Sequence, residues 1–312
     1  MKTFQLTILG SNAAMPAFGR LTSCQAINYN DNYFLVDTGE GAQIRLSEYK
    51  IKRNKLRCIF ISHLHGDHLF GLPGILTSYN HFNRNSPLHV FGPTGLKKYI
   101  DTNLEVGGTQ LSFDLQIHEI QMDSPTIIWK NHELTVTAFP LKHRIETYGY
   151  RFDEVLTQFN IKSEKIKEFG LSIDEIKTVK SGQDIRSGAD ILSYLDLVHA
   201  RPSARSYAYC SDTIYDESLV DVLDSVDILY HETTYTSEFE SEAAERYHTT
   251  GKQAAQIAKL SNAKTLVTGH YSSRYRRGEE PFREAKEYFP STLKGYDGFI
   301  LNILPAESSS EI

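Results

Sequence analysis

The chain has 312 residues, of which 40% are hydrophobic and 11% aromatic, and this composition can fill a sizeable core and argues against disorder. Lysine and arginine number 33 against 39 acidic residues, a formal net charge of -6, so the whole molecule is not a basic nucleic-acid-binding protein, although a local patch could still bind phosphates. No apolar run approaches the roughly 18 residues of a membrane span, and the first ten residues lack the apolar region of a secretory signal. Three cysteines without a CxxC pair argue against a disulfide framework. We therefore expect a soluble, cytoplasmic protein.

Short strands alternate with helices in the first half of the chain. Strands are predicted at 4–9, 25–29, 33–37, 57–62, 88–91, 111–120, 133–139 and 148–152. Helices are predicted at about 42–50, 71–80 and 94–104. Asn30, Asp31 and Asn32 predict a hairpin bend between the second and third strands.

The second half repeats this pattern. It has predicted strands at 206–211, 226–230, 264–268 and 298–303, and helices at about 216–224, 250–261 and 281–289. The alternation predicts an α/β fold with sheets inside and helices outside, organised as one domain over residues 1–312. The segment from about 153 to 200 differs, because it predicts two polar helices joined near Gly170 and Ser172 with little β character. It is either an inserted arm or an ordinary connection packed on the core.

Three histidines and an aspartate occur within six residues, directly after the predicted strand 57–62. They are His63, His65, Asp67 and His68. A surface histidine cluster is the alternative, but side chains gathered at a strand exit are costly to bury in charged form. A divalent metal ion removes that cost, since it binds neutral imidazole and carboxylate.

Three further candidate ligands, His143, Asp212 and His270, each follow a predicted strand by a few residues. A sheet edge can bring such residues to one place, and a two-metal site needs ligands beyond the first cluster. Asp37 ends the strand 33–37, and we expect it to accept a hydrogen bond from a ligand histidine.

Several motifs together are specific to one family. They are Leu35-Val-Asp-Thr-Gly-Glu-Gly41, Ser62-His-Leu-His-Gly-Asp-His68, Phe91-Gly-Pro-Thr-Gly-Leu96, Ser211-Asp-Thr213, His231-Glu-Thr-Thr-Tyr235, His248-Thr-Thr-Gly-Lys-Gln-Ala-Ala255 and Gly269-His-Tyr-Ser-Ser-Arg-Tyr275. The HxHxDH box resembles the metallo-β-lactamase superfamily, which implies an αββα sandwich. The later boxes resemble ribonuclease Z (tRNase Z, short form), and the resemblance covers nearly the whole chain.

This resemblance implies a zinc-dependent endoribonuclease that removes the 3′ trailer of precursor tRNA after the discriminator base. It implies two Zn²⁺ ions per subunit, with Mn²⁺ or Fe possible. One ion would be held by His63, His65 and His143, and the other by Asp67, His68 and His270, with Asp212 bridging.

Three residues are candidates for proton transfer. Asp67 would orient or deprotonate the attacking water, and His248, oriented by Glu232, would protonate the leaving 3′-oxygen. The alternatives are a histidine at a helix N-terminus for His248 and a structural hydrogen bond for Glu232.

Substrate contacts are predicted at Arg274, Ser272 and Arg20, although Arg274 could form a structural ion pair and Ser272 could be a turn residue. The family arm over about 153–200 grips tRNA, and its candidate contacts here are Lys162, Lys165 and Lys167. Its tip lacks the usual Gly-Pro pair and its charges nearly cancel, so it would act through shape and a few lysines or would grip more weakly. Leu21 follows Arg20 where the family usually has Asn, which affects how CCA-bearing tRNA is treated.

The expected partners are precursor tRNA and a second subunit in a homodimer, with neither membrane nor DNA. Two other functions stay open. The chain could be a hydrolase of small phosphodiesters or other esters on the same scaffold. It could also be a non-catalytic, metal-stabilised RNA-binding protein, but that would be marked by a missing ligand.

Overall fold

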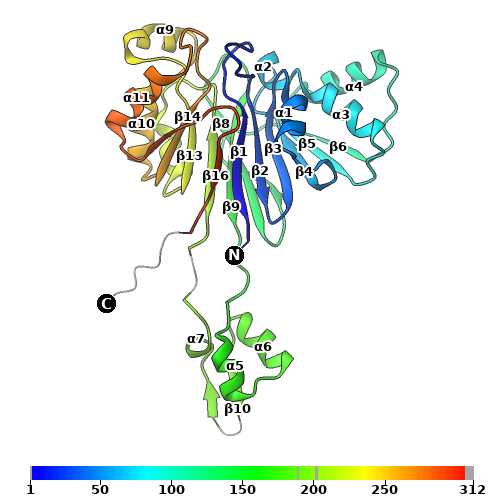
Figure 1. The fold of residues 1–312 in the computed structure, drawn as a ribbon, viewed down its shortest axis with the longest axis vertical. Helices are drawn as coiled ribbons and strands as arrows, with labels where there is room; N and C mark the ends of the chain where they lie inside the picture. Colours follow the sequence, from blue (N-terminus) through cyan, green and yellow to red (C-terminus); the bar gives the residue numbers. More distant parts are fainter. Residues whose placement is uncertain (1, 188–189, 201–202, 306–312) are drawn as a thin grey trace. The chain divides into compact units, whose positions relative to one another are not determined.

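The computed structural model describes residues 2–187, 190–200 and 203–305, and two seven-stranded sheets form its centre (Figure 1). The first sheet has the order β16 (Ile300–Asn302), β1 (Phe4–Gly10), β2 (Cys24–Tyr29), β3 (Asn32–Thr38), β4 (Leu56–Phe60), β5 (Leu88–Pro93) and β6 (Leu115–Ile120). The second has the order β15 (Thr292–Lys294), β14 (Thr265–Gly269), β13 (Ile228–Glu232), β12 (Ser206–Cys210), β9 (Thr147–Glu154), β8 (Leu134–Leu141) and β7 (Thr126–Lys130).

Parallel pairing in both sheets decides where the strand ends meet. Strands β3, β4, β5 and β6 are parallel neighbours in the first sheet. Strands β12, β13, β14 and β15 are parallel neighbours in the second. The carboxyl ends of parallel strands lie at one edge of a sheet, which is the place where α/β proteins build their sites.

Aromatic side chains fill the space between the sheets. Phe60 of β4 contacts both Tyr150 and Phe152 of β9, with ring centroids 5.3 and 5.6 Å apart. Phe34 of β3 also meets Phe152, at 6.3 Å. These side chains are almost fully buried, so their apolar area drives the two sheets together.

Helices cover the outer face of each sheet. The first sheet is covered by α1 (Ala42–Glu48), α3 (Leu72–His81) and α4 (Leu96–Val106), which pack into one buried cluster with β3, β4 and β5. The second is covered by α8 (Val220–Leu223), α10 (Gly251–Leu260) and α11 (Glu279–Tyr288). The small residues Ala254, Ala255 and Ala258 lie buried in that second cluster, which lets α10 pack closely. The predicted α/β sandwich with external helices is therefore confirmed.

The remaining elements are short. They are α2 (Gly66–Leu69), α9 (Glu240–Glu245) and the 3-10 helices η1 (Arg53–Lys55), η2 (Glu217–Leu219) and η3 (Ser237–Phe239). Asn30 and Asp31 have φ values of 49° and 62° in the β2–β3 hairpin, as the predicted bend requires. Among the described residues, no helix combines the length and apolarity that crossing a membrane demands.

The chain divides into two compact units. The first holds Met1–Ile128, Val136–Phe152 and Ser206–Ile303, and the second holds Trp129–Thr135, Asp153–Arg205 and residues 304–305 of the described C-terminal end. The second contains α5 (Ser163–Phe169), α6 (Ile173–Lys180), α7 (Tyr194–Leu197) and the hairpin of β10 (Ile185–Ser187) and β11 (Asp190–Leu192).

The second unit has a small core of its own. Leu171, Val179 and Leu197 are buried together, and the rings of Phe159 and Tyr194 pack beside them with centroids 5.1 Å apart. A buried ion pair of 2.6 Å joins Glu154 and Arg205, where the chain enters and leaves the segment. The hairpin of β10 and β11 is β-structure that the sequence of this segment did not predict.

Candidate metal centre and active site

Most of the candidate residues lie at or just after the carboxyl ends of strands in the first unit. Asp37 lies near the end of β3, and the cluster from His63 to His68 lies in the loop after β4 and the start of α2. In the second sheet, Asp212 follows β12, Glu232 ends β13 and His270 follows β14. The sequence predicted that these residues follow strands. The parallel pairing brings the ends of those strands, and so the residues, to one place.

Three of these residues have left-handed backbone conformations. The φ values are 57° for Asp37, 60° for Asp212 and 54° for His270. Residues other than glycine rarely adopt this region, and those that do concentrate at functional sites. Each of these residues lies at or next to the end of a strand, so the unusual backbone coincides with the sheet edge.

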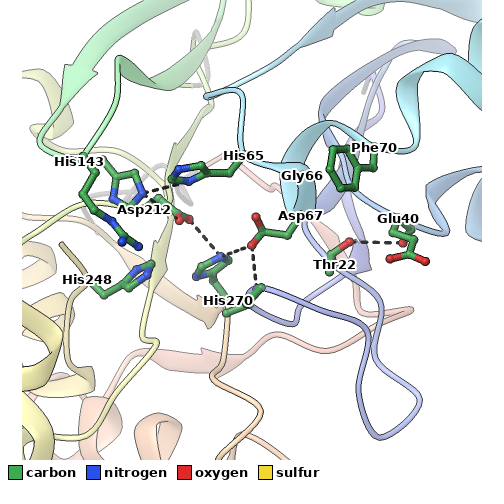
Figure 2. Close-up of a pocket in the computed structure, with 13 residues that line it drawn as sticks. Thr22, Glu40, His65, Gly66, Asp67, Phe70, His143, Asp212, His248 and His270 are labelled. Carbon is green, nitrogen blue, oxygen red and sulfur yellow. Dashed lines mark hydrogen bonds and ion pairs between the residues drawn. The ribbon is translucent and has the colours of Figure 1, made fainter. Parts of the chain in front are cut away.

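A first group of donor atoms lies beside the end of β4. His65 Nδ1 is 2.9 Å from His63 Nε2 and 3.3 Å from His143 Nε2. Oδ2 of Asp212 lies 3.7 Å from Nε2 of both His63 and His143. Figure 2 shows His65, His143 and Asp212 pointing toward one another. These four side chains can hold one metal ion.

A second group lies on the other side of Asp212. His68 Nε2 and His270 Nε2 are 3.3 Å apart, and Oδ2 of Asp67 lies 3.6 and 3.7 Å from them. Oδ1 of Asp212 is 3.1 Å from both nitrogens. The two oxygens of Asp212 thus face different groups, which is the arrangement of a bridging carboxylate.

The donor set fits metal ions better than hydrogen bonding alone. A tetrahedral zinc ion with ligands at about 2.0–2.1 Å has ligand atoms about 3.3 Å apart, and the distances within both groups lie around that value. Burial lowers the pKa of His63 and of His143, which keeps both imidazoles neutral, as metal ligands must be.

The Nδ1 atoms of three ligand candidates, which are not the donor atoms described above, have hydrogen-bond partners that fix the rings. His63 Nδ1 lies 3.0 Å from Ser62 Oγ, His143 Nδ1 lies 3.1 Å from the Tyr247 carbonyl, and His270 Nδ1 lies 2.9 Å from Thr234 Oγ1. Such contacts set the ring orientation and raise ligand basicity.

Asp37 occupies the outer position behind His68. Its Oδ2 accepts from His68 Nδ1 at 2.7 Å, from Tyr209 Oη at 2.7 Å and from Ser62 Oγ at 2.9 Å, and its Oδ1 accepts from Ser62 N. Tyr209 belongs to β12 of the second sheet. Asp37 therefore orients His68 and joins the two sheets at one buried carboxylate, in keeping with the hydrogen bond predicted from the sequence.

His248, which is partly buried, pairs with the fully buried Glu232 beside the donor groups. Both oxygens of Glu232 lie 3.1 Å from His248 Nδ1, and the same carboxylate accepts from the backbone N–H groups of Thr213 and Thr249. Burial disfavours the charged imidazole, but attraction to Glu232 outweighs it and raises the pKa of His248 to about 9. The contact with Glu232 therefore favours the protonated imidazole.

A cavity of about 400 Å³ opens over these residues. It is lined by His65, Asp67, His143, Asp212, His248 and His270, and also by residues to which the sequence analysis assigned no role (Figure 2). Those are Ala13, Ala14, Thr22, Glu40, Gly66, Phe70 and Arg144. Arg144 directly follows the ligand candidate His143, which is the signal that could have drawn attention to it.

Arg20, a predicted RNA contact, is engaged within the protein. Its side chain is buried, and its guanidinium donates to Asn12 Oδ1 and to the carbonyl oxygens of Tyr275 and Arg276. The charge therefore ties the loop around residues 12–20 to the loop after β14. Arg20 does not line the cavity, and its contact with RNA stays a prediction.

The two predicted contacts after His270 are engaged with other residues. Arg274 pairs with Glu242 at 3.0 Å and its guanidinium lies 3.9 Å from the centre of the Phe239 ring. Ser272 Oγ accepts from the backbone N–H of Arg274 in a turn. Neither residue lines the cavity, and their contact with substrate stays a prediction.

The three lysines lie on or next to α5 in the second unit. Lys162 donates to the Asp196 carbonyl, Lys165 pairs with Glu168 at 2.8 Å, and Lys167 is exposed. Contacts of this kind on a surface are weak, so all three ammonium groups could exchange them for phosphates.

Comparison with known proteins identifies the family. A family model described as "Anti-Pycsar protein Apyc1" matches residues 4–158, which leaves out Asp212, His248 and His270. A ribonuclease Z of Cytophaga hutchinsonii is 41% identical over 297 residues, which cover 95% of each chain. The crystal structure of human tRNase Z, short form, has a TM-score of 0.71 and 24% identity and covers 96% of this chain and 99% of its own. The metallo-β-lactamase fold protein YhfI of Bacillus subtilis has a TM-score of 0.68 and 18% identity, covering 96% and 99%. The chain has the metallo-β-lactamase fold and belongs to the ribonuclease Z family.

Proposed function

We propose that this protein is a zinc-dependent endoribonuclease that removes the 3′ trailer of precursor tRNA. It hydrolyses the phosphodiester after the discriminator base and leaves a 3′-hydroxyl on the tRNA and a 5′-phosphate on the trailer. Family membership supports the substrate. The placement of Asp212 between two donor groups is the observation that supports metal-dependent hydrolysis, because its two oxygens could bind two ions at once.

The donor groups define which residues would hold two Zn²⁺ ions, or Mn²⁺ in their place. His63, His65 and His143 would hold one, Asp67, His68 and His270 would hold the other, and Asp212 would be shared. When bound, such ions lower the pKa of water and neutralise charge that develops on the phosphoryl oxygens.

Asp67 aligns the attacking water. Its Oδ2 accepts from the backbone N–H of Ala14 at 2.8 Å, which fixes the carboxylate at the floor of the cavity. A carboxylate held there can accept a proton from water as the water attacks phosphorus.

His248 supplies the proton for the leaving 3′-oxygen. The imidazole lines the cavity, and Glu232 holds it in its protonated form. An alkoxide is a poor leaving group, so a positioned acid speeds the step by typically 10²–10⁴-fold.

The segment over about 153–200 acts as an arm that binds the tRNA body away from the scissile bond. Its own core and its surface lysines support this role. We also propose a homodimer in the cytoplasm, a location that agrees with three free, buried cysteines. Neither DNA nor a membrane is expected as a partner.

The test compares two substrates on one zinc-loaded preparation, a precursor tRNA with a 3′ trailer and a small chromogenic phosphodiester. We expect cleavage of the precursor at the discriminator, and none with Asp212→Ala. His248→Ala should slow the chemical step and keep its zinc content. Activity on the small ester alone would instead support a hydrolase of small substrates, and a loss of zinc from His248→Ala would make His248 a ligand.

A further inference from the structure

The cavity over the donor groups has two chemically different ends. Figure 2 shows His143 and His248 at one end and Phe70, Thr22 and Glu40 at the other, with Asp67 between them. Arg144 follows His143 in the chain and also lines the cavity. One end is thus cationic, and the other combines an aromatic ring with a carboxylate.

Phe70 is an exposed ring in a fixed position. Its relative exposure is 63%, although its neighbour Leu69 is only 1% exposed. The Phe70 amide donates to the Gly66 carbonyl at 2.9 Å, and the next amide, of Gly71, donates to Thr38 at 2.7 Å. The backbone on both sides of the ring is therefore fixed.

Gly66 allows the ring to lie where it does. A Cβ atom at residue 66 would be 2.3 Å from Phe70 Cε2 and 2.4 Å from Cζ, which is closer than atoms can approach. The ring therefore packs directly over the backbone of the metal-site loop. An aromatic ring held in this way beside the site of cleavage can stack on a nucleic-acid base.

The proposed chemistry gives the bound strand a direction. His248 protonates the 3′-oxygen of the discriminator nucleoside, so that nucleoside lies at the His248 end. The phosphate stays with the trailer, and the strand continues toward the other end. Glu40 disfavours a second phosphate there, whereas an uncharged base is accepted.

We propose that Phe70 is the stacking platform for the first base of the 3′ trailer. This inference rests on the proposed function and deepens it, because it names what recognises the leaving fragment. Every base has an aromatic face, so the platform requires a base at this position without selecting one of the four.

The experiment compares two precursor tRNAs, which differ only in having a normal or an abasic first trailer nucleotide. Loss of the base should lower kcat/KM of the wild type about tenfold or more. Phe70→Ala should cleave the normal precursor as poorly as the abasic one. Phe70→Tyr should again cleave the normal precursor faster than the abasic one. Phe82→Ala is the control, since Phe82 is 61% exposed and lies outside the cavity.

Two outcomes would overturn the inference, and they are distinct. If removing the base lowers kcat/KM of Phe70→Ala by the same factor as that of the wild type, another residue stacks on the base. The proposed function then still stands. If the wild type cleaves neither precursor, the proposed function fails and this inference fails with it. Equal zinc content and thermal midpoints for all variants show that the metal site and fold are intact.

Discussion

The carboxylate of Glu232 places both of its oxygens 3.1 Å from Nδ1 of His248. The carboxylate is fully buried and also accepts two backbone N–H groups, so it cannot turn away from the imidazole. A negative charge held this close favours the protonated imidazole. This favours a proton donor at His248, but Asp37 contacts the ligand candidate His68 in the same way, and Asp212, His248 and His270 could together hold an ion.

Replacing Glu232 by Gln should move the alkaline limb of the pH–rate profile. The neutral amide no longer raises the pKa of His248 above its usual range, so that pKa falls by about 1–3 units. A proton donor is active while protonated, and activity disappears as pH rises through its pKa. The alkaline limb of kcat should therefore shift to lower pH, with zinc content unchanged. A limb at its original pH together with a loss of zinc would show that Glu232 organises the metal site instead.

Arg144→Ala should weaken binding of the RNA strand at the cationic end of the cavity. Among the described residues Arg144 forms no ion pair, so its charge is available to a phosphate. We expect a higher KM for precursor tRNA and a log–log salt slope smaller by about one. Lys142→Ala is the matched control, because Lys142 is already paired with Asp216 at 2.9 Å. Equal effects of both variants would contradict a specific contact.

Changing Lys162, Lys165 and Lys167 together to alanine should lower affinity for precursor tRNA. Each lysine that no longer binds a phosphate reduces the salt dependence of binding, so the slope should flatten by up to about three. Hydrolysis of a small phosphodiester should not change. Lys177→Ala, which removes a lysine from the next helix, α6, is the control for a general loss of surface charge. A parallel loss on both substrates would mean that the arm does not bind tRNA.

Arg20→Ala should destabilise the fold by about 1–3 kcal/mol, because it leaves buried carbonyl and amide oxygens without donors. The thermal midpoint, measured by calorimetry, should fall. Arg20→Lys should not restore it, since one ammonium cannot replace two parallel N–H donors to Asn12. An unchanged midpoint with weaker RNA binding would restore the contact first predicted from the sequence.

The strands that carry the site could be predicted because they are buried, apolar and bounded by polar turns. β7 and β15 were not predicted, and neither was the hairpin of β10 and β11. β15 and the hairpin strands are only three residues long, so they depend on their pairing partners and show no periodicity of their own. β7 lies at the edge of its sheet and is largely exposed, which removes the apolar pattern of a core strand.

The ligand candidates could be predicted because four of them are adjacent in sequence and the others follow strands. The contacts of the residues around these ligands could not be predicted. Arg20 finds its acceptors at Tyr275 and Arg276, more than 250 residues away, so nothing local distinguishes it from an exposed arginine. In the sequence, Phe70 cannot be distinguished from an apolar core residue. Only the tertiary structure shows that it lines the cavity.

The bridging position of Asp212 has a consequence for how the protein is made. The first donor group needs residue 212 as well as the cluster near residue 63, and the second also needs residue 270. Asp37 meets Tyr209 only when both sheets are present. A chain emerging from the ribosome therefore cannot complete either site until most of it has been synthesised. We therefore expect metal uptake to be completed late in maturation, and fragments that end before residue 270 to lack part of the donor set.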